Sequence, residues 1–316
     1  GQCETPLSGE LSPELSTELS IGYPITEIGS TIIPGNYIES CAIFGDIAVI
    51  TSASYSKVYI YNITNGSIPR LEQMLTSSDA APDDRFGSAV AIYGDNIVVG
   101  ANKDDDYGEN SGSAYVFSKQ PDGSWAQVSK LTASDASVDN QFGDSVAIYG
   151  DNIVVGSYGD FHNGIKSGAV YVFSKQPDGS WAQATKLTAS DYERGLFFGW
   201  SVAIHGDTIV VGAIGDDGPG LSVYPAALDH GSAYVFSKQT DGSWAQVSKM
   251  TASDAENNDY FGWSVDIHGD TIVVGAAYKD HWRSGSDSGS AYVYTKQDNG
   301  SWVYNRRLRA DDAAEG

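Results

Sequence analysis

The chain has 316 residues, of which 41 are acidic and 18 basic, so its formal net charge is −23. A phosphate backbone favours lysine and arginine, so this balance argues against nucleic acid as a partner. Thirty-six glycines and nineteen tyrosines against two methionines favour many short strands and tight turns over helices. No apolar run approaches the ~18 residues of a membrane-spanning helix, so we expect no direct membrane insertion.

The N-terminal segment, residues 1–36, precedes the repeats and holds one of only two cysteines. A disulfide from Cys3 to Cys41 would pin this segment onto the first repeat in an oxidising compartment, and two free thiols are the alternative. Three glycosylation sequons fit the same compartment and begin at Asn62, Asn65 and Asn299. We therefore expect a secreted or cell-surface protein, whose polar start is either a mature end left by signal removal or simply the start of the chain.

One segment of 16 residues recurs almost unchanged along the chain. Its four complete copies begin at intervals of 56, 56 and 63 residues and span 86–101, 142–157, 198–213 and 261–276. A degenerate fifth copy precedes them at 40–50, with Tyr37 in the place of the first phenylalanine. Self-similarity of this kind indicates a repeat architecture.

Each copy predicts four strands and no helix. In the first complete copy the strands cover 88–92, 97–99, 113–117 and 125–131. The second is a continuous apolar run, as expected of a strand buried on both faces, whereas the fourth alternates apolar and polar residues as an outer strand does. The Pro-Asp-Gly-Ser segment at 121–124 is a strong hairpin signal between the last two.

Four antiparallel strands repeated in this way are typical of a propeller blade. We therefore predict an all-β fold, a β-propeller of four-stranded antiparallel blades with five repeats in this chain. A β-sandwich is the competing all-β architecture, but it does not predict near-identical repeats. The repeats cover about 37–80, 81–136, 137–192, 193–255 and 256–316, after the N-terminal segment 1–36.

The Phe-Gly that opens each complete copy and the Val-Gly-Ala that closes most of them resemble the FG-GAP repeat of integrin α-subunit propellers. The blades are more similar still to those of FG-GAP proteins from bacteria and unicellular eukaryotes, which read Phe-Gly-x-Ser-Val-Ala-Ile-x-Gly-Asp-x-Ile-Val-Val-Gly-Ala. The resemblance covers residues 37 to about 310. It implies an extracellular propeller used for adhesion or ligand binding, often with calcium.

The chain departs from integrin propellers in two respects. Integrin calcium blades have an Asp-x-Asn-x-Asp-Gly loop where this chain has short turns such as 150–152, too short to supply the about six to eight oxygens that calcium takes. Integrin propellers also have seven blades. Residues 23–32 stand where a ring-closing strand would fall, whereas the tail from residue 308 matches the linker that leads into another repeat. The sequence therefore leaves two alternatives, a closed ring of five blades or part of a longer propeller.

Strand direction alternates within a blade, so the connections separate onto two faces. The short turns share one face, and the two-to-three loops share the other with the linkers between blades. These loops differ from copy to copy, and variable loops on a uniform scaffold are where binding is usually built, although drift at unconstrained tips is the alternative. The candidate ligand-contacting rings in them are Tyr107, Phe161, His162, Tyr224, His230, His281 and Trp282.

Acidic residues concentrate in the same loops. Oxygen-rich loops with nearby glycines could hold Ca²⁺, and solvated loop acids are the alternative. No loop matches a strict calcium-binding pattern such as that of the EF-hand. The candidate metal ligands are Asp104, Asp105, Asp106, Glu109, Asp216 and Asp217. No other cofactor is expected.

The last two complete copies differ from the earlier ones by a tryptophan and a histidine in the first strand. Trp200 and Trp263 follow Phe-Gly only in the last two complete copies, so the pattern leaves their role open. His205 and His268 occupy the position that Tyr93 holds in an earlier copy, which predicts a scaffold role.

The sequence favours a binding protein over an enzyme, because it holds no zinc-type histidine spacing, nucleophile elbow or phosphate-cradling loop. We predict an extracellular adhesion or ligand-binding propeller that uses its variable acidic loops on a protein ligand, a glycan ligand or copies of itself. A structural subunit of an extracellular assembly is the first alternative. A glycan hydrolase or lyase with a central pair of carboxylates is the second.

Overall fold

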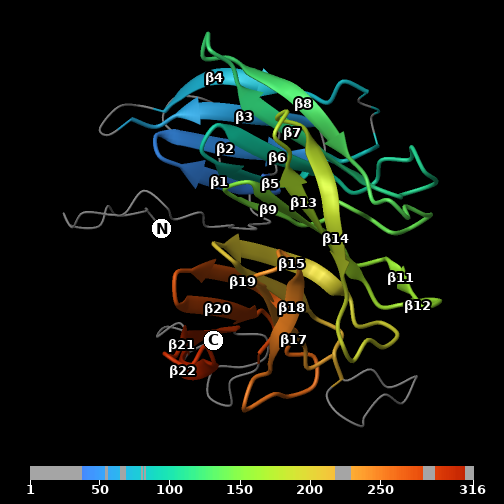
Figure 1. Ribbon diagram of the computed structural model, residues 1–316, viewed down its shortest axis with the longest axis vertical. Coiled ribbons are helices and arrows are strands. Elements are labelled where there is room, and N and C mark those ends of the chain that lie inside the picture. Colours follow the sequence, from blue (N-terminus) through green and yellow to red (C-terminus); the bar gives the residue numbers. More distant parts are fainter. Residues whose placement is uncertain are drawn as a thin grey trace, which may run out of the picture.

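The computed structural model describes residues 38–53, 56–64, 69–79, 81, 83–217, 229–279 and 289–309. These residues form five four-stranded antiparallel sheets, each from strands consecutive in the chain apart from a small hairpin inserted in the third. Figure 1 shows the five sheets following one another from blue to red. The predicted all-β propeller of four-stranded blades is confirmed. No helix in this part of the chain is long and apolar enough to cross a membrane.

We number the blades one to five in chain order. Blade one holds β1 (Cys41–Phe44), β2 (Ile47–Ser52), β3 (Lys57–Asn62) and β4 (Arg70–Leu75). Blade two holds β5 (Phe86–Tyr93), β6 (Asn96–Ala101), β7 (Ser113–Lys119) and β8 (Trp125–Leu131). Blade three holds β9 (Val146–Tyr149), β10 (Asn152–Ser157), β13 (Ala169–Lys175) and β14 (Trp181–Leu187), and its two-to-three loop carries the hairpin of β11 (Phe161–His162) and β12 (Ile165–Lys166). Blade four holds β15 (Phe198–His205), β16 (Thr208–Ala213), β17 (Ser232–Lys238) and β18 (Trp244–Met250). Blade five holds β19 (Phe261–His268), β20 (Thr271–Ala276), β21 (Ser290–Lys296) and β22 (Trp302–Leu308).

The second strand of a blade is apolar throughout because neighbouring blades cover both faces of the sheet. In β6, Ile97 and Val99 pack toward blade one, whereas Val98 packs toward blade three, and all three are fully buried. Val273, which corresponds to Val98 in blade five, is only half-buried. The described part of the chain supplies no sixth blade to cover that face, and the five sheets do not close into a ring (Figure 1).

The first strands of the blades line the central axis, where β1, β5, β9, β15 and β19 pack in sequence. At the strand ends nearest the short turns, aromatic and imidazole side chains of successive blades pack against one another in a row. Phe44, Tyr93, Tyr149, His205 and His268 follow one another with centroids 5.1, 4.7, 4.6 and 4.8 Å apart. The two histidines therefore belong to the scaffold, as their place in the repeat predicts.

In blades two to five, the Phe-Gly segment packs against the preceding blade. Phe198 is fully buried, and the carbonyl oxygen of Gly199 accepts a hydrogen bond of 2.9 Å from the hydroxyl of Ser145 in blade three. The Cα of Gly156 lies so close that a Cβ built there would stand 2.1 Å from the same carbonyl. The glycines of the repeat thus permit a backbone-to-backbone joint between blades.

Candidate functional site

Hydrogen bonds confirm that the connections separate onto two faces. On the turn face, which carries the one-to-two and three-to-four turns, the Lys175 amide donates to the carbonyl of Asp151 at 2.9 Å. On the loop face, which carries the two-to-three loops and the linkers, the Phe198 amide donates to the carbonyl of Ser167 at 2.9 Å. The variable segments therefore surround one end of the axis.

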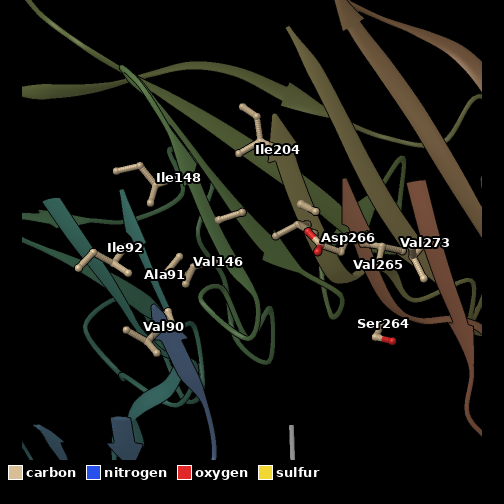
Figure 2. Close-up of a pocket in the computed structure, with 14 residues that line it drawn as sticks. Val90, Ala91, Ile92, Val146, Ile148, Ile204, Ser264, Val265, Asp266 and Val273 are labelled. Atoms are coloured by element: carbon tan, nitrogen blue, oxygen red, sulfur yellow. The ribbon is translucent and has the colours of Figure 1, made fainter. Parts of the chain in front are cut away.

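The axis holds two cavities, one beyond the other along the first strands. The inner one, of about 410 Å³, is bounded by aliphatic side chains such as Val90, Val146 and Ile204, with Asp266 projecting among them (Figure 2). Asp266 stands where sister blades have alanine, and burial raises the pKa of its carboxyl. The inner cavity is therefore lined mainly by apolar side chains.

The outer cavity, of about 740 Å³, opens at the loop face and we call it the axial cavity. Each blade contributes to its wall the residue after Phe-Gly or its counterpart in blade one. These five residues are Glu39, Ser88, Asp144, Trp200 and Trp263. A volume of roughly 300–1,000 Å³ is typical of small-molecule sites, so the axial cavity is large enough for a ligand.

One wall of the axial cavity is aromatic and comes from blades three to five. The ring of Trp200 lies between Tyr158 and Trp263, with centroids 5.1 and 5.2 Å away. All three rings are half-buried, so each keeps part of its surface open. Burial raises the pKa of the Tyr158 phenol to about 12, which keeps it a neutral hydrogen-bonding group.

The facing wall is polar and comes from blades one to three. Arg85 donates to the carboxylate of Glu39 at 2.7 Å, and the Asn102 amide donates to the carboxylate of Asp144 at 2.5 Å. With Lys103, the described lining residues comprise two acidic and two basic side chains. The axial cavity is therefore close to neutral in a strongly acidic protein.

Burial raises the pKa of the Asp144 carboxyl to about 6, although the hydrogen bond from Asn102 and the charge of Arg85 oppose the shift. The folded protein therefore holds this proton more tightly than the unfolded chain. The contribution of protonated Asp144 to the free energy of unfolding is complete at low pH and is lost as pH rises through about 6.

We expect Asp144→Asn to abolish this pH dependence. Relative to the variant, wild-type stability should fall by roughly 2 kcal/mol between pH 4 and pH 7, a figure discounted for partial exposure. Urea unfolding at both pH values measures it. Asp122→Asn, in an exposed turn, should leave the wild-type dependence across this window intact, and parallel curves for wild type and Asp144→Asn would contradict the assignment.

The residue just before each Phe-Gly adopts a left-handed backbone conformation. The φ angles of Arg85, Gln141, Phe197 and Tyr260 lie between 53° and 55°. Such angles cost non-glycine residues about 1–3 kcal/mol and persist where the surrounding structure imposes them, often at binding sites. Here Arg85 and Gln141 line the axial cavity, and Phe197 and Tyr260 pack edge-on against its tryptophans Trp200 and Trp263.

The predicted ligand-contacting rings that the structure describes lie outside the axial cavity. Tyr107 and Phe161 are 59% and 51% exposed on outer loops. His162 packs edge-on against Tyr192, and a ring nitrogen of His230 lies 3.0 Å from the carbonyl of Asp217. Tyr224, His281 and Trp282 fall outside the described residues.

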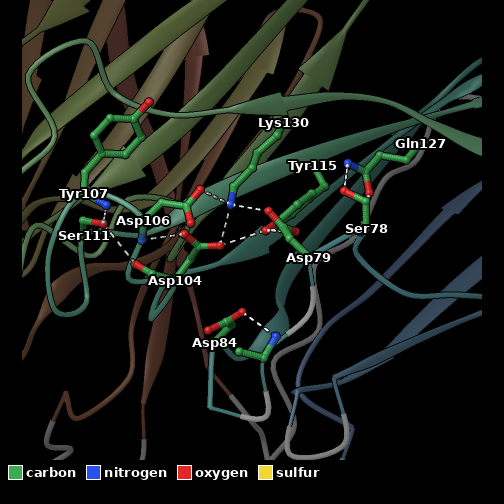
Figure 3. A network of polar contacts seen from close by, with 11 residues as sticks. Ser78, Asp79, Asp84, Asp104, Asp106, Tyr107, Ser111, Tyr115, Gln127 and Lys130 are labelled. Carbon is green, nitrogen blue, oxygen red and sulfur yellow. Dashed lines mark hydrogen bonds and ion pairs between the residues drawn. The ribbon is translucent and has the colours of Figure 1, made fainter.

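The predicted metal ligands Asp104 and Asp106 surround a lysine. The Lys130 ammonium lies 2.9 Å from Asp104, 2.6 Å from Asp106 and 2.6 Å from Asp79 (Figure 3). The Tyr115 hydroxyl donates to Asp104 at 2.8 Å. Burial alone lowers the pKa of Lys130, but the hydrogen bonds to Asp106, Asp79 and Asp104 outweigh it and raise that pKa.

The same network recurs in the next two blades. Lys186 pairs with Asp135 and Asp160, each at 2.7 Å, and Lys249 pairs with Asp216 at 2.5 Å. In blade five, Lys279 replaces the buried aspartate and pairs instead with Asp259 at 3.0 Å.

The other predicted metal ligands make hydrogen bonds within their loops or to the neighbouring linker. The carboxylate of Asp105 accepts from the Asn110 amide at 2.7 Å, and that of Asp217 accepts from the Asp229 amide at 3.0 Å. The backbone carbonyl of Glu109 accepts from the Asp139 amide at 2.8 Å.

The carboxylates of Asp79, Asp104 and Asp106 offer oxygens within 4.8 Å of one another, which is compact enough for a cation. As they stand they do not fit Ca²⁺, because the Lys130 ammonium already pairs with all three carboxylates and calcium would have to displace it. Calcium binding stays a prediction.

We expect Lys130→Met to bind Ca²⁺ more tightly than the wild type, because the variant leaves three carboxylates without their counterion. Calcium should therefore raise its melting temperature by several degrees more than that of the wild type. Magnesium, which keeps more of its own waters, serves as the control. Equal calcium shifts in both proteins would refute competition between lysine and metal.

The predicted disulfide and glycosylation sites stay predictions. Cys41 lies half-buried in β1, and Cys3 is outside the described residues. Asn299 is exposed in the last hairpin turn, and the carboxamide of Asn62 donates to Glu72 at 3.1 Å. Asn65 is also outside the described residues.

Four-stranded blades that repeat along the chain and join through Phe-Gly define a repeat protein of the β-propeller class. A family model described as FG-GAP repeat matches residues 70–117, 125–173, 181–236 and 244–294. The chain therefore belongs to the FG-GAP repeat family. Each match runs from the fourth strand of one blade to the third strand of the next.

Solved structures align with the chain at low sequence identity. A functionally unknown protein of Desulfotomaculum acetoxidans aligns with a TM-score of 0.54 and 12% identity over 89% of this chain and 72% of its own. A protein of Lactobacillus plantarum aligns with a TM-score of 0.51 and 12% identity over 85% and 73%. A periplasmic gluconolactonase of Pseudomonas aeruginosa gives a TM-score of 0.43 and 14% identity over 84% and 82%. No curated protein matches the sequence. The first two likenesses show the fold alone.

The polar wall of the axial cavity is absent from the sites predicted from sequence. A signal for it exists in the repeat, since the position after Phe-Gly changes from serine to aspartate to tryptophan between copies that are otherwise nearly identical.

Proposed function

We propose that this protein is an extracellular ligand-binding propeller whose ligand enters the axial cavity from the loop face. The observation that supports it is the convergence of Glu39, Asp144, Trp200 and Trp263 on one cavity. The blades are otherwise nearly identical, yet the residue after Phe-Gly differs between them. Such variation at one position is expected where the residues form a binding site and do not only maintain the fold.

The proposal shifts the predicted site from the outer acidic loops to the axis. Several loop aspartates form ion pairs with Lys130, Lys186 and Lys249. These carboxylates therefore stabilise the blades and are not free to bind a ligand. The rings at the axis instead offer open apolar area beside hydrogen-bonding groups, which is the composition of most ligand sites.

We expect Trp263→Ala to lower affinity by at least tenfold, since truncating an aromatic anchor typically costs about 2 kcal/mol or more. Panels of immobilised extracellular-matrix proteins and mixed glycans, probed with both proteins, would measure it. Phe161→Ala removes an exposed ring on an outer loop and should change little. Loss of binding in Phe161→Ala with retention in Trp263→Ala would return the site to the loops.

A glycan-cleaving activity is the second candidate, because Glu39 and Asp144 line the same cavity with different environments. The carboxyl of Asp144, with a pKa of about 6, suits a general acid, while Glu39 forms an ion pair with Arg85 at 2.7 Å. Release of reducing sugar by the wild type and not by Asp144→Asn, at glycan concentrations that saturate both proteins, would establish it. Binding without release in both proteins would leave the cavity as a recognition site.

A further inference from the structure

We infer that the axial cavity recognises an uncharged glycan, with one sugar ring lying against Trp200 and Trp263 and its hydroxyls directed at the Asp144–Asn102 pair. The inference rests on the proposed function and specifies the chemical class of its ligand.

The two walls of the cavity differ in chemistry, and a sugar ring differs in the same way. The C–H face of a pyranose is apolar and packs on an aromatic ring, whereas its rim carries hydroxyls. Trp200 and Trp263, 5.2 Å apart and inclined by 52°, form an angled aromatic platform. Arg85, Asn102 and Asp144 on the other wall supply donors and acceptors. A ligand with only apolar or only charged groups would leave one wall unsatisfied.

The polar wall has hydrogen-bonding capacity that the described residues leave unused. Asn102 is 98% buried, and its Oδ1 has no hydrogen-bond partner among the described residues. The Glu39 side chain is 25% exposed, but its Oε2 atom is buried and also has no hydrogen-bond partner among the described residues. Buried polar atoms are nearly always paired in folded proteins, so two such acceptors at one wall indicate a missing donor. Neighbouring sugar hydroxyls can each donate one hydrogen bond and accept another, which suits carboxylate and amide groups placed side by side.

The charges select against ionic ligands. Glu39 is paired with Arg85, and among the described lining residues Lys103 offsets the remaining carboxylate. Since the cavity is nearly neutral and the whole chain carries −23, a polyanion such as a sulfated or uronic-acid polymer meets net repulsion. A basic peptide would be attracted to the protein as a whole, but among the described lining residues the aromatic wall offers it no carboxylate. An uncharged polyol avoids both difficulties.

The test titrates the whole chain with neutral hexasaccharides derived from cellulose, chitin, mannan and galactan. Heparin and alginate fragments serve as anionic probes, and immobilised matrix proteins as peptide probes. Calorimetry gives the affinity, and tryptophan fluorescence reports directly on the cavity. We expect at least one neutral probe to bind, with Trp200→Ala and Asp144→Asn each lowering its affinity tenfold or more. Trp200→Phe, which keeps an aromatic face, should stay within about threefold, and Tyr107→Ala should equal the wild type.

The outcomes separate the ligand class from the site. If only anionic or protein probes bind, and the cavity variants abolish that binding, the glycan inference is overturned and the proposed site stands. Binding of any probe that is indifferent to Trp200→Ala and Asp144→Asn overturns both. Failure of every neutral probe overturns the inference. Melting curves of each variant distinguish loss of binding from loss of fold, and Trp200→Phe supplies a folded variant should Trp200→Ala be unstable.

Discussion

Replacing Gly156 with alanine should destabilise the protein by roughly 3 kcal/mol or more. The added Cβ would stand 2.1 Å from the carbonyl oxygen of Gly199 and 2.1 Å from the hydroxyl of Ser145. Ordinary contacts of a Cβ are longer than 3.4 Å, and a backbone carbonyl of the next blade can move only if the two sheets separate. The φ angle of Gly156 is not in the left-handed region, so the effect is steric and owes nothing to backbone preference.

Urea unfolding of the variant measures this effect, and Gly150→Ala is the matched control. Gly150 lies in the turn between β9 and β10 with φ of +55°, and an added Cβ would meet nothing within 4 Å. That change should cost only the left-handed penalty of about 1–2 kcal/mol. If the two variants unfold at the same urea concentration, the close approach of the blades does not contribute to stability.

Lys186→Met should destabilise the protein by about 3–5 kcal/mol, because it removes the counterion of a buried carboxylate. Asp160 is 1% exposed and receives hydrogen bonds from Lys186 and from the Tyr171 hydroxyl, each at 2.7 Å. Burial raises the pKa of Asp160 even in the presence of Lys186, and removal of Lys186 would raise that pKa further. The destabilisation should therefore shrink as pH falls, since a protonated carboxyl needs no counterion.

Two variants make this prediction specific. Lys175→Met removes an exposed lysine whose ammonium lies 5.7 Å from the Trp181 ring centroid, and should cost less than about 1 kcal/mol. Lys186→Met combined with Asp160→Asn should recover much of the stability lost by the single variant, because no buried charge is left unpaired. Equal effects of Lys186→Met and Lys175→Met would show that the network is not a stabilising element.

The loop acids show why sequence could propose a calcium site but not a lysine network. Asp104 and Lys130 are 26 residues apart and meet because β7 pairs with β8 in a fixed register, which brings the end of the fourth strand back to the two-to-three loop. The sequence pattern of the loop alone shows aspartates and glycines, which calcium loops and solvated turns share. Only the neighbouring strand decides which cation neutralises them.

The repeat architecture itself was predictable because it rests on local signals. Apolar runs, alternation in strands such as Trp125–Leu131 and the Asp-Gly turns recur in each copy, and each acts over a few residues. All five repeats therefore follow from sequence, and the strand limits predicted for the first complete copy are close to those observed in blade two. The inserted hairpin of Phe161–His162 and Ile165–Lys166 was not predicted, since two-residue strands carry too little pattern.

The sequence by itself determined that this chain forms propeller blades joined through Phe-Gly, because every blade repeats the same local rules of strand and turn. Only the tertiary structure decided that Glu39, Asp144 and Trp263 share one cavity. They come from separate repeats, and they meet because the first strand of each blade lies at a common axis, which brings the residue after Phe-Gly, or its counterpart in blade one, to the mouth of the cavity. Proximity across blades depends on how whole sheets pack, and no short segment of sequence encodes it.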